Sequence, residues 1–261
     1  MFGFNQHDLR LLINLFKMLV RDRFLGSALG SVWAITNPLF MLAVFTYVFG
    51  FIFKSKLPGA ETTLTYVIWL ISGYGPWLSI SEAILSSANS VVGATGIVKN
   101  IAFKTELLPI AGALIGIINL TVSLIFLLIL IPWSGGSLTW NLLFLPAILI
   151  VQFAFLIGLG IWLSVIVVFI RDVAQLLPTL LLITLFMTPI FYPIENIPNI
   201  AQKISLLNPI HHIMSSYRDV FVESRAPDTL SLVIVFVASL TLIHLGLRMF
   251  RRAKGQFDSA L

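Results

Sequence analysis

Apolar residues along this chain come in long uninterrupted blocks rather than at the spacing that buries one face of a soluble helix or strand. A helix of about 20 apolar residues is long enough to cross the hydrocarbon core of a membrane, which is about 30 Å thick. The blocks that meet this length are residues 32–53, 64–92, 109–131, 140–170, 173–192 and 229–248. The pattern therefore predicts an all-α integral membrane protein with six transmembrane helices.

The blocks differ in length and in charge. The second and fourth are longer than one crossing needs, so we expect these helices to tilt, kink or extend beyond the membrane. The first, third, fourth and fifth blocks contain no charged residue. This absence supports their assignment to the membrane interior.

The N-terminal region follows a different pattern, with polar residues spaced three or four positions apart. Apolar residues fill the other faces of the helix that this spacing describes. The spacing predicts an amphipathic helix that lies in the membrane interface. An ordinary anchor helix with one solvated face would show the same pattern. The polar positions are His7, Arg10, Asn14, Lys17 and Arg21.

Composition and charge agree with a membrane protein. Hydrophobic residues make up 58% of the 261 residues and charged ones 10%, whereas about a quarter of a typical soluble chain is charged. With both termini in the cytoplasm, eleven lysines and arginines lie inside and five outside, which satisfies the positive-inside rule. We therefore expect the net charge of +5 to set topology and to meet anionic lipid, and we expect no nucleic-acid partner.

These patterns predict a single transmembrane domain over residues 1–261. Residues 1–27 form the interfacial helix and a loop, and residues 28–248 form the six-helix membrane domain. Gly26 and Gly30 permit a sharp turn between the interfacial helix and the first span. Residues 249–261 form a cytoplasmic tail.

The sequence contains no sign of catalysis or of a metal site. It lacks the glycine-rich Gly-x-x-x-x-Gly-Lys-Ser/Thr loop that cradles ATP phosphates. No histidine stands at metal-binding spacing from a second ligand. Glu82 and His244 fall near the inner boundary of their blocks. Glu82 serves either in a proton relay, which needs partners that the neighbouring sequence does not offer, or as a hydrated or hydrogen-bonded side chain.

The segment VKNIAFKTELLP, residues 98–109, is polar between two apolar blocks. Pro109 suits the first turn of the next helix, so the preceding residues form a separate short segment. Phe103, Leu107 and Leu108 offer an apolar face, and Lys104 and Glu106 offer directional polar contacts. Such a segment either docks into a groove of a soluble partner or is an ordinary solvated loop.

Two further groups of side chains carry candidate roles. Arg21 and Arg23 stand where a lipid phosphate would lie, and simple anchoring explains them equally well. Aromatic side chains in or beside the blocks commonly anchor a protein at the membrane interface or face lipid. These aromatics are Tyr47, Trp69, Tyr74, Trp77 and Tyr192.

Several short motifs in a fixed order connect the chain to a known family. They are LGSVWAITNPLF, VFGFIF, SGYGPW, FKTELLP, FIRDV, TPIFYP and NP followed by YRDVF, with FRRAKGQFDSAL at the end. In this order, and with six spans, the whole chain resembles the transmembrane subunit of a type-2 ABC exporter of cell-surface polysaccharide. That class includes exporters of O-antigen, capsule and teichoic acid.

The resemblance implies an assembly and a location. It implies a homodimer in the bacterial inner membrane, bound to two copies of a separate ABC ATPase that carries the ATP and magnesium, so that this chain has no cofactor of its own. It implies a lipid-linked polysaccharide as cargo, most commonly O-antigen on undecaprenyl pyrophosphate, and membrane lipids around the protein. With such a cargo, the aromatic side chains named above would either pack against the C–H faces of sugar rings or remain interface anchors.

The resemblance also assigns roles to segments. The N-terminal helix and the loop around Leu29 and Gly30, with Arg21 and Arg23, would guard the cytoplasmic entrance. The segment 98–109 would contact the ATPase, and residues 193–227 would form short re-entrant helices on the outer side between the fifth and sixth spans. Relatives often carry Phe-Pro where this chain has Phe103–Lys104, which leaves the first turn of the ATPase-contacting segment in question.

Other function classes remain open at this point. A type-2 ABC exporter for capsule, teichoic acid, lipid or drug would share most of the pattern, although drug and lipid exporters usually carry a large extracellular insertion or a fused ATPase. A flippase that moves polyprenyl-linked sugars without ATP would need clustered carboxylates at a membrane face, and the sequence shows none.

Overall fold

The structure is a computed structural model that describes residues 5–23, 25–53, 63–96 and 104–257. Over these ranges the chain forms helices and connecting turns and no strand. The α-helices are α1 (Gln6–Arg23), α2 (Trp33–Phe45), α3 (Thr63–Gly93), α5 (Leu107–Leu114), α6 (Gly116–Trp133), α7 (Leu145–Phe169), α8 (Asp172–Met187), α9 (Asn199–Leu207), α10 (Pro209–Phe221) and α11 (Thr229–Ala253). Short 3-10 helices are η1 (Gly30–Val32), η3 (Trp140–Phe144), η4 (Ile194–Asn196) and η5 (Lys254–Gln256), and η2 (Thr46–Ile52) is a π-helix.

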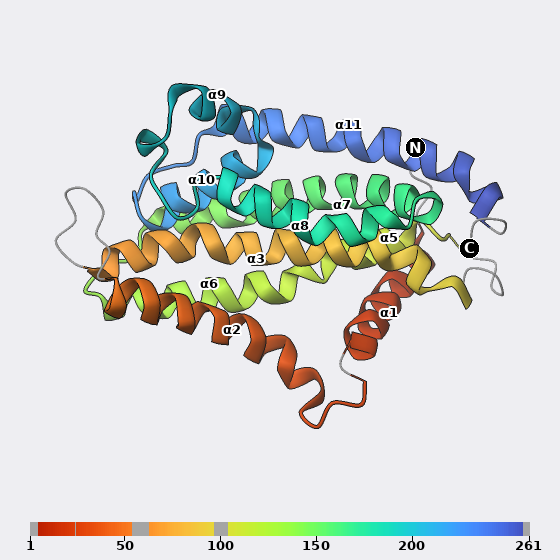
Figure 1. Ribbon diagram of the computed structural model, residues 1–261, viewed down its shortest axis with the longest axis horizontal. Helices are drawn as coiled ribbons and strands as arrows, with labels where there is room; N and C mark the ends of the chain where they lie inside the picture. Colours follow the sequence, from red (N-terminus) through yellow and green to blue (C-terminus); the bar gives the residue numbers. More distant parts are fainter. Residues whose placement is uncertain (1–4, 24, 54–62, 97–103, 258–261) are drawn as a thin grey trace.

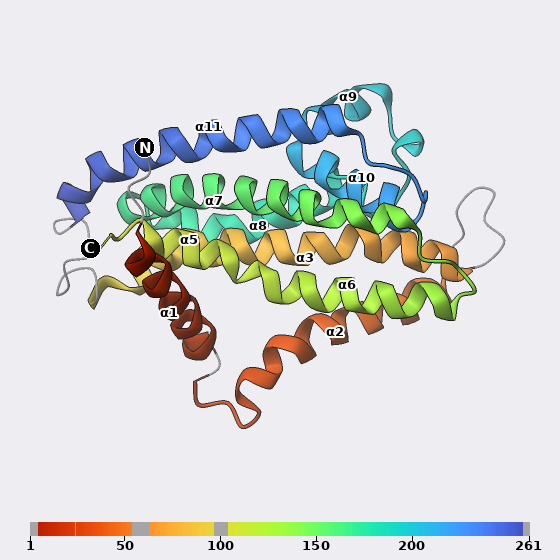
Figure 2. The same ribbon diagram turned by 180° about the vertical axis from the view of Figure 1, so that it is seen from behind.

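The long helices run side by side along one axis, whereas α1 lies at an angle to them (Figures 1 and 2). The start of α1, the start of α5 and the end of α11 share one end of this bundle, and α9 and α10 lie at the other end. The chain therefore passes back and forth between two ends, as the block pattern predicts.

Four segments are long and apolar enough to cross a membrane. They are Gly30–Ile52, Leu107–Trp133, Trp140–Phe169 and Thr229–Gln256, and they correspond to the first, third, fourth and sixth predicted spans. The fifth predicted span contains α8, an apolar helix of 16 residues that is shorter than the others. An all-helical membrane protein is thus confirmed, with four clear candidate spans among the described residues.

The second predicted span coincides with α3, which is 31 residues long but less apolar than those four segments. Serines and glycines lower its hydropathy, and most of its residues are nevertheless buried. It packs against α5, α6, α7, α8 and α10. A helix enclosed by protein does not need an apolar surface, because its polar groups can bond to neighbouring helices instead of facing lipid.

Small residues bring α3 very close to its neighbours around Ser87. A Cβ placed on Gly112 of α5 would lie 2.7 Å from the Ser87 Cα, and a Cβ on Gly160 of α7 would meet the Ser87 side chain. The Ser87 hydroxyl donates a hydrogen bond to the Pro109 carbonyl. Glycine at both positions is therefore what allows three helices to meet here, as is common at helix contacts in membranes.

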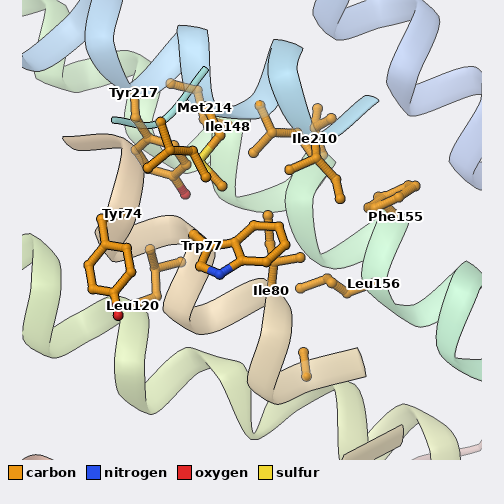
Figure 3. Close-up of a cluster of buried hydrophobic side chains, with 14 of the residues drawn as sticks. Tyr74, Trp77, Ile80, Leu120, Ile148, Phe155, Leu156, Ile210, Met214 and Tyr217 are labelled. Atoms are coloured by element: carbon orange, nitrogen blue, oxygen red, sulfur yellow. The ribbon is translucent and has the colours of Figure 1, made fainter. Parts of the chain in front are cut away.

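The main hydrophobic cluster lies between α3, α6, α7 and α10. Figure 3 shows side chains from these helices turned toward one another. Buried members include Trp77, Ile80, Leu120, Ile148, Leu156, Ile213, Met214 and Tyr217.

A chain of hydrogen bonds crosses this buried region. The Tyr217 hydroxyl of α10 donates to the Gln152 Oε1 of α7 at 2.7 Å, and the Gln152 Nε2 donates to the Ser79 Oγ of α3 at 3.0 Å. All three side chains are buried. Because no solvent reaches them, the three groups depend on one another for their hydrogen bonds.

The segment predicted to be re-entrant contains η4, α9 and α10. Asn208 caps α10, because its side chain accepts a hydrogen bond from the Ile210 amide. Arg218 of α10 donates to the carbonyls of Pro189 at 2.6 Å and Ile190 at 2.9 Å, and its guanidinium lies 3.8 Å from the Trp69 ring centre. These contacts fix α10 against α3 and the end of the loop after α8.

We predict that Gln152→Ala lowers the free energy of unfolding by about 1–3 kcal/mol, because it leaves the buried Tyr217 and Ser79 hydroxyls without their partner. Thermal or denaturant unfolding of the purified protein in detergent measures the change. Gln175→Ala is the matched control, since Gln175 is exposed on α8, and we expect it to stay within about 0.5 kcal/mol of wild type. Equal losses in the two variants would contradict the role of the buried chain.

Candidate functional site

The end of the bundle that holds α1 contains most of the residues for which the sequence predicts a function. α1 packs mainly against α5. Its Leu15 belongs to a buried apolar cluster with Leu107 and Leu108 of α5 and Phe250 of α11. The apolar face that the sequence assigns to α1 is therefore covered, at least in part, by protein.

An ion pair joins the start of α1 to the turn before α5. The Lys104 Nζ lies 2.6 Å from the Asp8 Oδ2, and the Asn5 amide donates to the same oxygen at 2.7 Å. The Lys104 hydrogen bond, followed by that of Asn5, lowers the pKa of Asp8 below its ordinary value. Asp8 thus stays ionised and keeps Lys104 bound to α1.

A second ion pair joins the same turn to α11. Glu106 is only 5% exposed, and its Oε1 accepts a hydrogen bond from the Arg251 Nε at 3.2 Å. The turn itself is closed by backbone bonds from the Leu107 amide to the Lys104 carbonyl and from the Leu108 amide to the Thr105 carbonyl, at 3.0 and 3.1 Å. Lys104 and Glu106 are therefore both bonded within the chain.

The apolar residues of the predicted ATPase-contacting segment are buried. Leu107 and Leu108 lie in the cluster with Leu15, and Pro109 lies in the first turn of α5, as the sequence predicts. Phe103 lies outside the described residues. The structure thus places Lys104, Glu106, Leu107, Leu108 and Pro109 together, and it turns much of the segment toward the protein.

A third ion pair lies at the other end of α1. The Arg23 Nη1 contacts the Glu82 Oε1 of α3. Both side chains line a cleft of about 170 Å³ between α1, α2, α3 and the region where α5 meets α6. Its other lining residues are Val20, Trp33, Ala34, Asn37, Pro38, Met41, Leu78, Ile115, Ile118 and Asn119.

Sequence reasoning finds no partner for Glu82, and the structure supplies one. Arg23 stands 59 residues away, on a helix that runs at an angle to the bundle, so no local spacing relates the two. The neighbouring sequence offers Glu82 no partner, as expected, and the expectation of a hydrogen-bonded Glu82 is confirmed.

The other residues predicted to guard an entrance lie on α1 and in the connection between α1 and α2. Arg21 is exposed and lines a shallow hollow on α1, and Leu29 is 53% exposed. Gly26 and Gly30 have φ of +79° and +51°, a region that favours glycine. The turn that the sequence expects at these two glycines is present.

The candidate glycan-contacting aromatics lie in different environments. Trp69, Tyr74 and Trp77 are buried in the protein, whereas Tyr47 is 60% exposed. The Tyr192 hydroxyl donates to the Phe186 carbonyl. Contact with a sugar by the first three would require neighbouring helices to separate, so their role in glycan binding stays a prediction.

Metal and relay chemistry gain no support from the part of the chain that the structure describes. It contains no group of three or more His, Cys, Asp or Glu residues that could hold a metal ion. His244 is exposed on α11.

Comparison with known proteins links the whole arrangement to membrane transport. The model of the ABC-2 type transporter family matches residues 11–222. The chain is 25% identical over 253 residues to the O-antigen export system permease protein RfbA of Myxococcus xanthus, covering 96% of this chain and 95% of that protein. It is 25% identical over 244 residues to the protein of the same name in Klebsiella pneumoniae, with 93% and 91% covered. It is 26% identical over 248 residues to the polysialic acid transport protein KpsM of Escherichia coli, with 91% of each covered.

We predict that Lys104→Met raises the pH at which α1 separates from the bundle in acid. The pKa of Asp8 is depressed in the folded protein, so its stabilising contribution is present above the ordinary value of about 3.9 and is lost as pH falls through the folded value. Without Lys104 the largest cause of that depression is gone, and protonation occurs at higher pH.

The measurement is the emission of a fluorophore on Leu9→Cys, which is a unique label because the chain has no cysteine. Leu9 is exposed on α1. Lys17→Met, which removes an exposed lysine of the same helix, should leave the midpoint unchanged. If the emission changes at the same pH in Lys104→Met and in the wild type, the ion pair does not control the pH at which α1 separates from the bundle.

Proposed function

The chain belongs to the ABC-2 type transporter family, and we propose that it is the permease subunit of an ATP-driven exporter of cell-surface polysaccharide. The observation that carries this proposal is similarity over more than nine-tenths of the chain to permeases named for O-antigen and polysialic acid. The apolar helices of the structure support the membrane location.

The energy source in this proposal is a separate subunit. The sequence has no phosphate-binding loop of the Gly-x-x-x-x-Gly-Lys-Ser/Thr type, so two copies of an ABC ATPase hydrolyse ATP, with magnesium, for a homodimer of this chain. They dock at the bundle end that holds the turn at Lys104–Glu106 and the start of α5. The position of this turn at one extremity of the helices supports that assignment.

The proposed cargo is a polysaccharide on a lipid carrier, namely O-antigen on undecaprenyl pyrophosphate. Its phosphates would enter at the cleft beside Arg23, with Arg21, Leu29 and Gly30 at the rim. Its sugars would pass aromatic side chains, of which the exposed Tyr47 is accessible without rearrangement. The similarity to polysialic acid transport proteins favours capsular polysaccharide as the second candidate cargo.

The proposed topology has six spans in the inner membrane and both termini in the cytoplasm. In it, α3 and α8 cross together with the four more apolar segments, and α9 and α10 re-enter from the outer side. The enclosure of α3 by other helices and the return of α10 into the bundle support this arrangement.

We predict that the chain co-purifies with an ABC ATPase encoded beside it, and that deleting its gene removes surface polysaccharide while the lipid-linked polymer accumulates inside the cell. Sugar analysis of the accumulated polymer identifies the cargo as O-antigen or capsule. Export that continues when the ATPase is inactivated by mutation would refute the proposal and would favour a flippase that works without ATP.

A further inference from the structure

The helix α1 is bonded to the rest of the protein by an ion pair at each end. Asp8 binds Lys104 of the turn before α5, and Arg23 binds Glu82 of α3 at the entrance cleft. The two α1 residues are 15 positions apart, which corresponds to about 22 Å along a helix that rises about 1.5 Å per residue. One uninterrupted helix thus connects the turn to the cleft.

Three ion pairs involve α1 or the turn before α5, and in each of them the carboxylate is less exposed than the cation that it binds. The side chains of Asp8, Glu106 and Glu82 are 11%, 7% and 18% exposed. Their partners Lys104, Arg251 and Arg23 are 38%, 48% and 45% exposed. Loss of a cation leaves a shielded negative charge uncompensated, so these links resist separation more than fully exposed pairs do.

The contacts along α1 differ from those at its ends. In the middle, Leu15 packs in the apolar cluster that contains Leu107 and Leu108 of α5, so α1 and α5 are in direct contact through apolar side chains. At the cleft, the Arg23–Glu82 pair joins α1 to α3 through a polar contact. A displacement of the turn before α5 would therefore move α1, and the strain would reach the Arg23–Glu82 pair.

We propose that α1 is a rigid link that transmits movement of the turn at Lys104–Glu106 to the cleft, where it separates Arg23 from Glu82 and opens the entrance. Asp8 is a positioning residue in this device, because it ties α1 to the turn. Glu82 holds the cleft end of α1 in place until the turn moves. The inference rests on the proposed function for the origin of the movement, but the link itself belongs to this chain alone.

The first experiment uses the isolated protein, so that its outcome does not depend on any ATPase. A fluorophore on Leu25→Cys reports on the cleft end of α1, where Leu25 is exposed and no other cysteine exists. We expect Lys104→Asp to shift the emission of this distant label. The double variant Asp8→Lys with Lys104→Asp, which exchanges the two charges, should restore the wild-type emission.

Lys203→Asp is the matched control, because it makes the same substitution at an exposed position of α9, at the other end of the bundle. If Lys104→Asp and Lys203→Asp give the same emission, or if the exchange of charges fails to restore it in a variant that melts at the wild-type temperature, the link does not exist. Such a negative result in the first experiment would leave the proposed function unaffected.

The second experiment uses the chain in vesicles with its ATPase and measures ATP hydrolysis and polysaccharide export together. Asp8→Lys should keep ATPase binding but lower the polysaccharide exported per ATP by about threefold to fivefold, because the ion pair that ties α1 to the turn is lost. Asp8→Glu should retain the wild-type ratio.

An unchanged ratio in Asp8→Lys would overturn the inference, since the turn would then drive export without α1. A wild-type chain that never binds the ATPase would instead overturn the proposed function, even where the first experiment confirms the link.

Discussion

The enclosure of α3 by other helices is the constraint on which the rest of the structure depends. This helix carries serines whose hydroxyls lipid could not satisfy, and α5, α6, α7, α8 and α10 pack against it. The Ser79–Gln152–Tyr217 chain fixes α3 to α7 and α10, and the contact around Ser87 fixes it to α5 and α7. Because the turn that holds Lys104 and Glu106 directly precedes α5, the packing of α3 against α5 also determines the position of the proposed docking segment.

The functional end of the molecule combines this rigid core with ionic contacts that can separate. The apolar side chains packed between α1 and α5 leave these two helices little freedom to move relative to each other, because packed interiors deform as discrete units rather than continuously. The ion pairs, whose cations are about half exposed, are weaker than this apolar packing, and water can replace either partner of a pair. The proposed link needs both properties, because movement of the turn must reach the cleft and the Arg23–Glu82 pair must still be able to separate. The arrangement of α1 between the turn and the cleft satisfies both requirements within this chain.

Much of this architecture could be predicted from the sequence, because helix-length apolar blocks and helical spacing are local signals. Features of this kind are the N-terminal helix, the turn at Gly26 and Gly30, Pro109 in the first turn of α5 and the four clearest spans. The pairing of Glu82 with Arg23 and the inward bonding of Lys104 and Glu106 were not predictable, because each joins residues far apart in the chain. The aromatic residues show the same limit, since helical spacing does not tell whether a tryptophan such as Trp69 faces a channel or covers an arginine.

The low hydropathy of α3 has a consequence for how the protein is made. A segment rich in serine gains little by entering lipid alone. Two of its serines have partners that follow it in the chain, because Ser79 binds Gln152 on α7 and Ser87 binds the Pro109 carbonyl on α5. During synthesis, α3 would have to wait beside the insertion machinery until α5, α6 and α7 emerged and could enter the bilayer with it. Membrane insertion of this chain is then a cooperative event of several helices rather than a succession of independent ones.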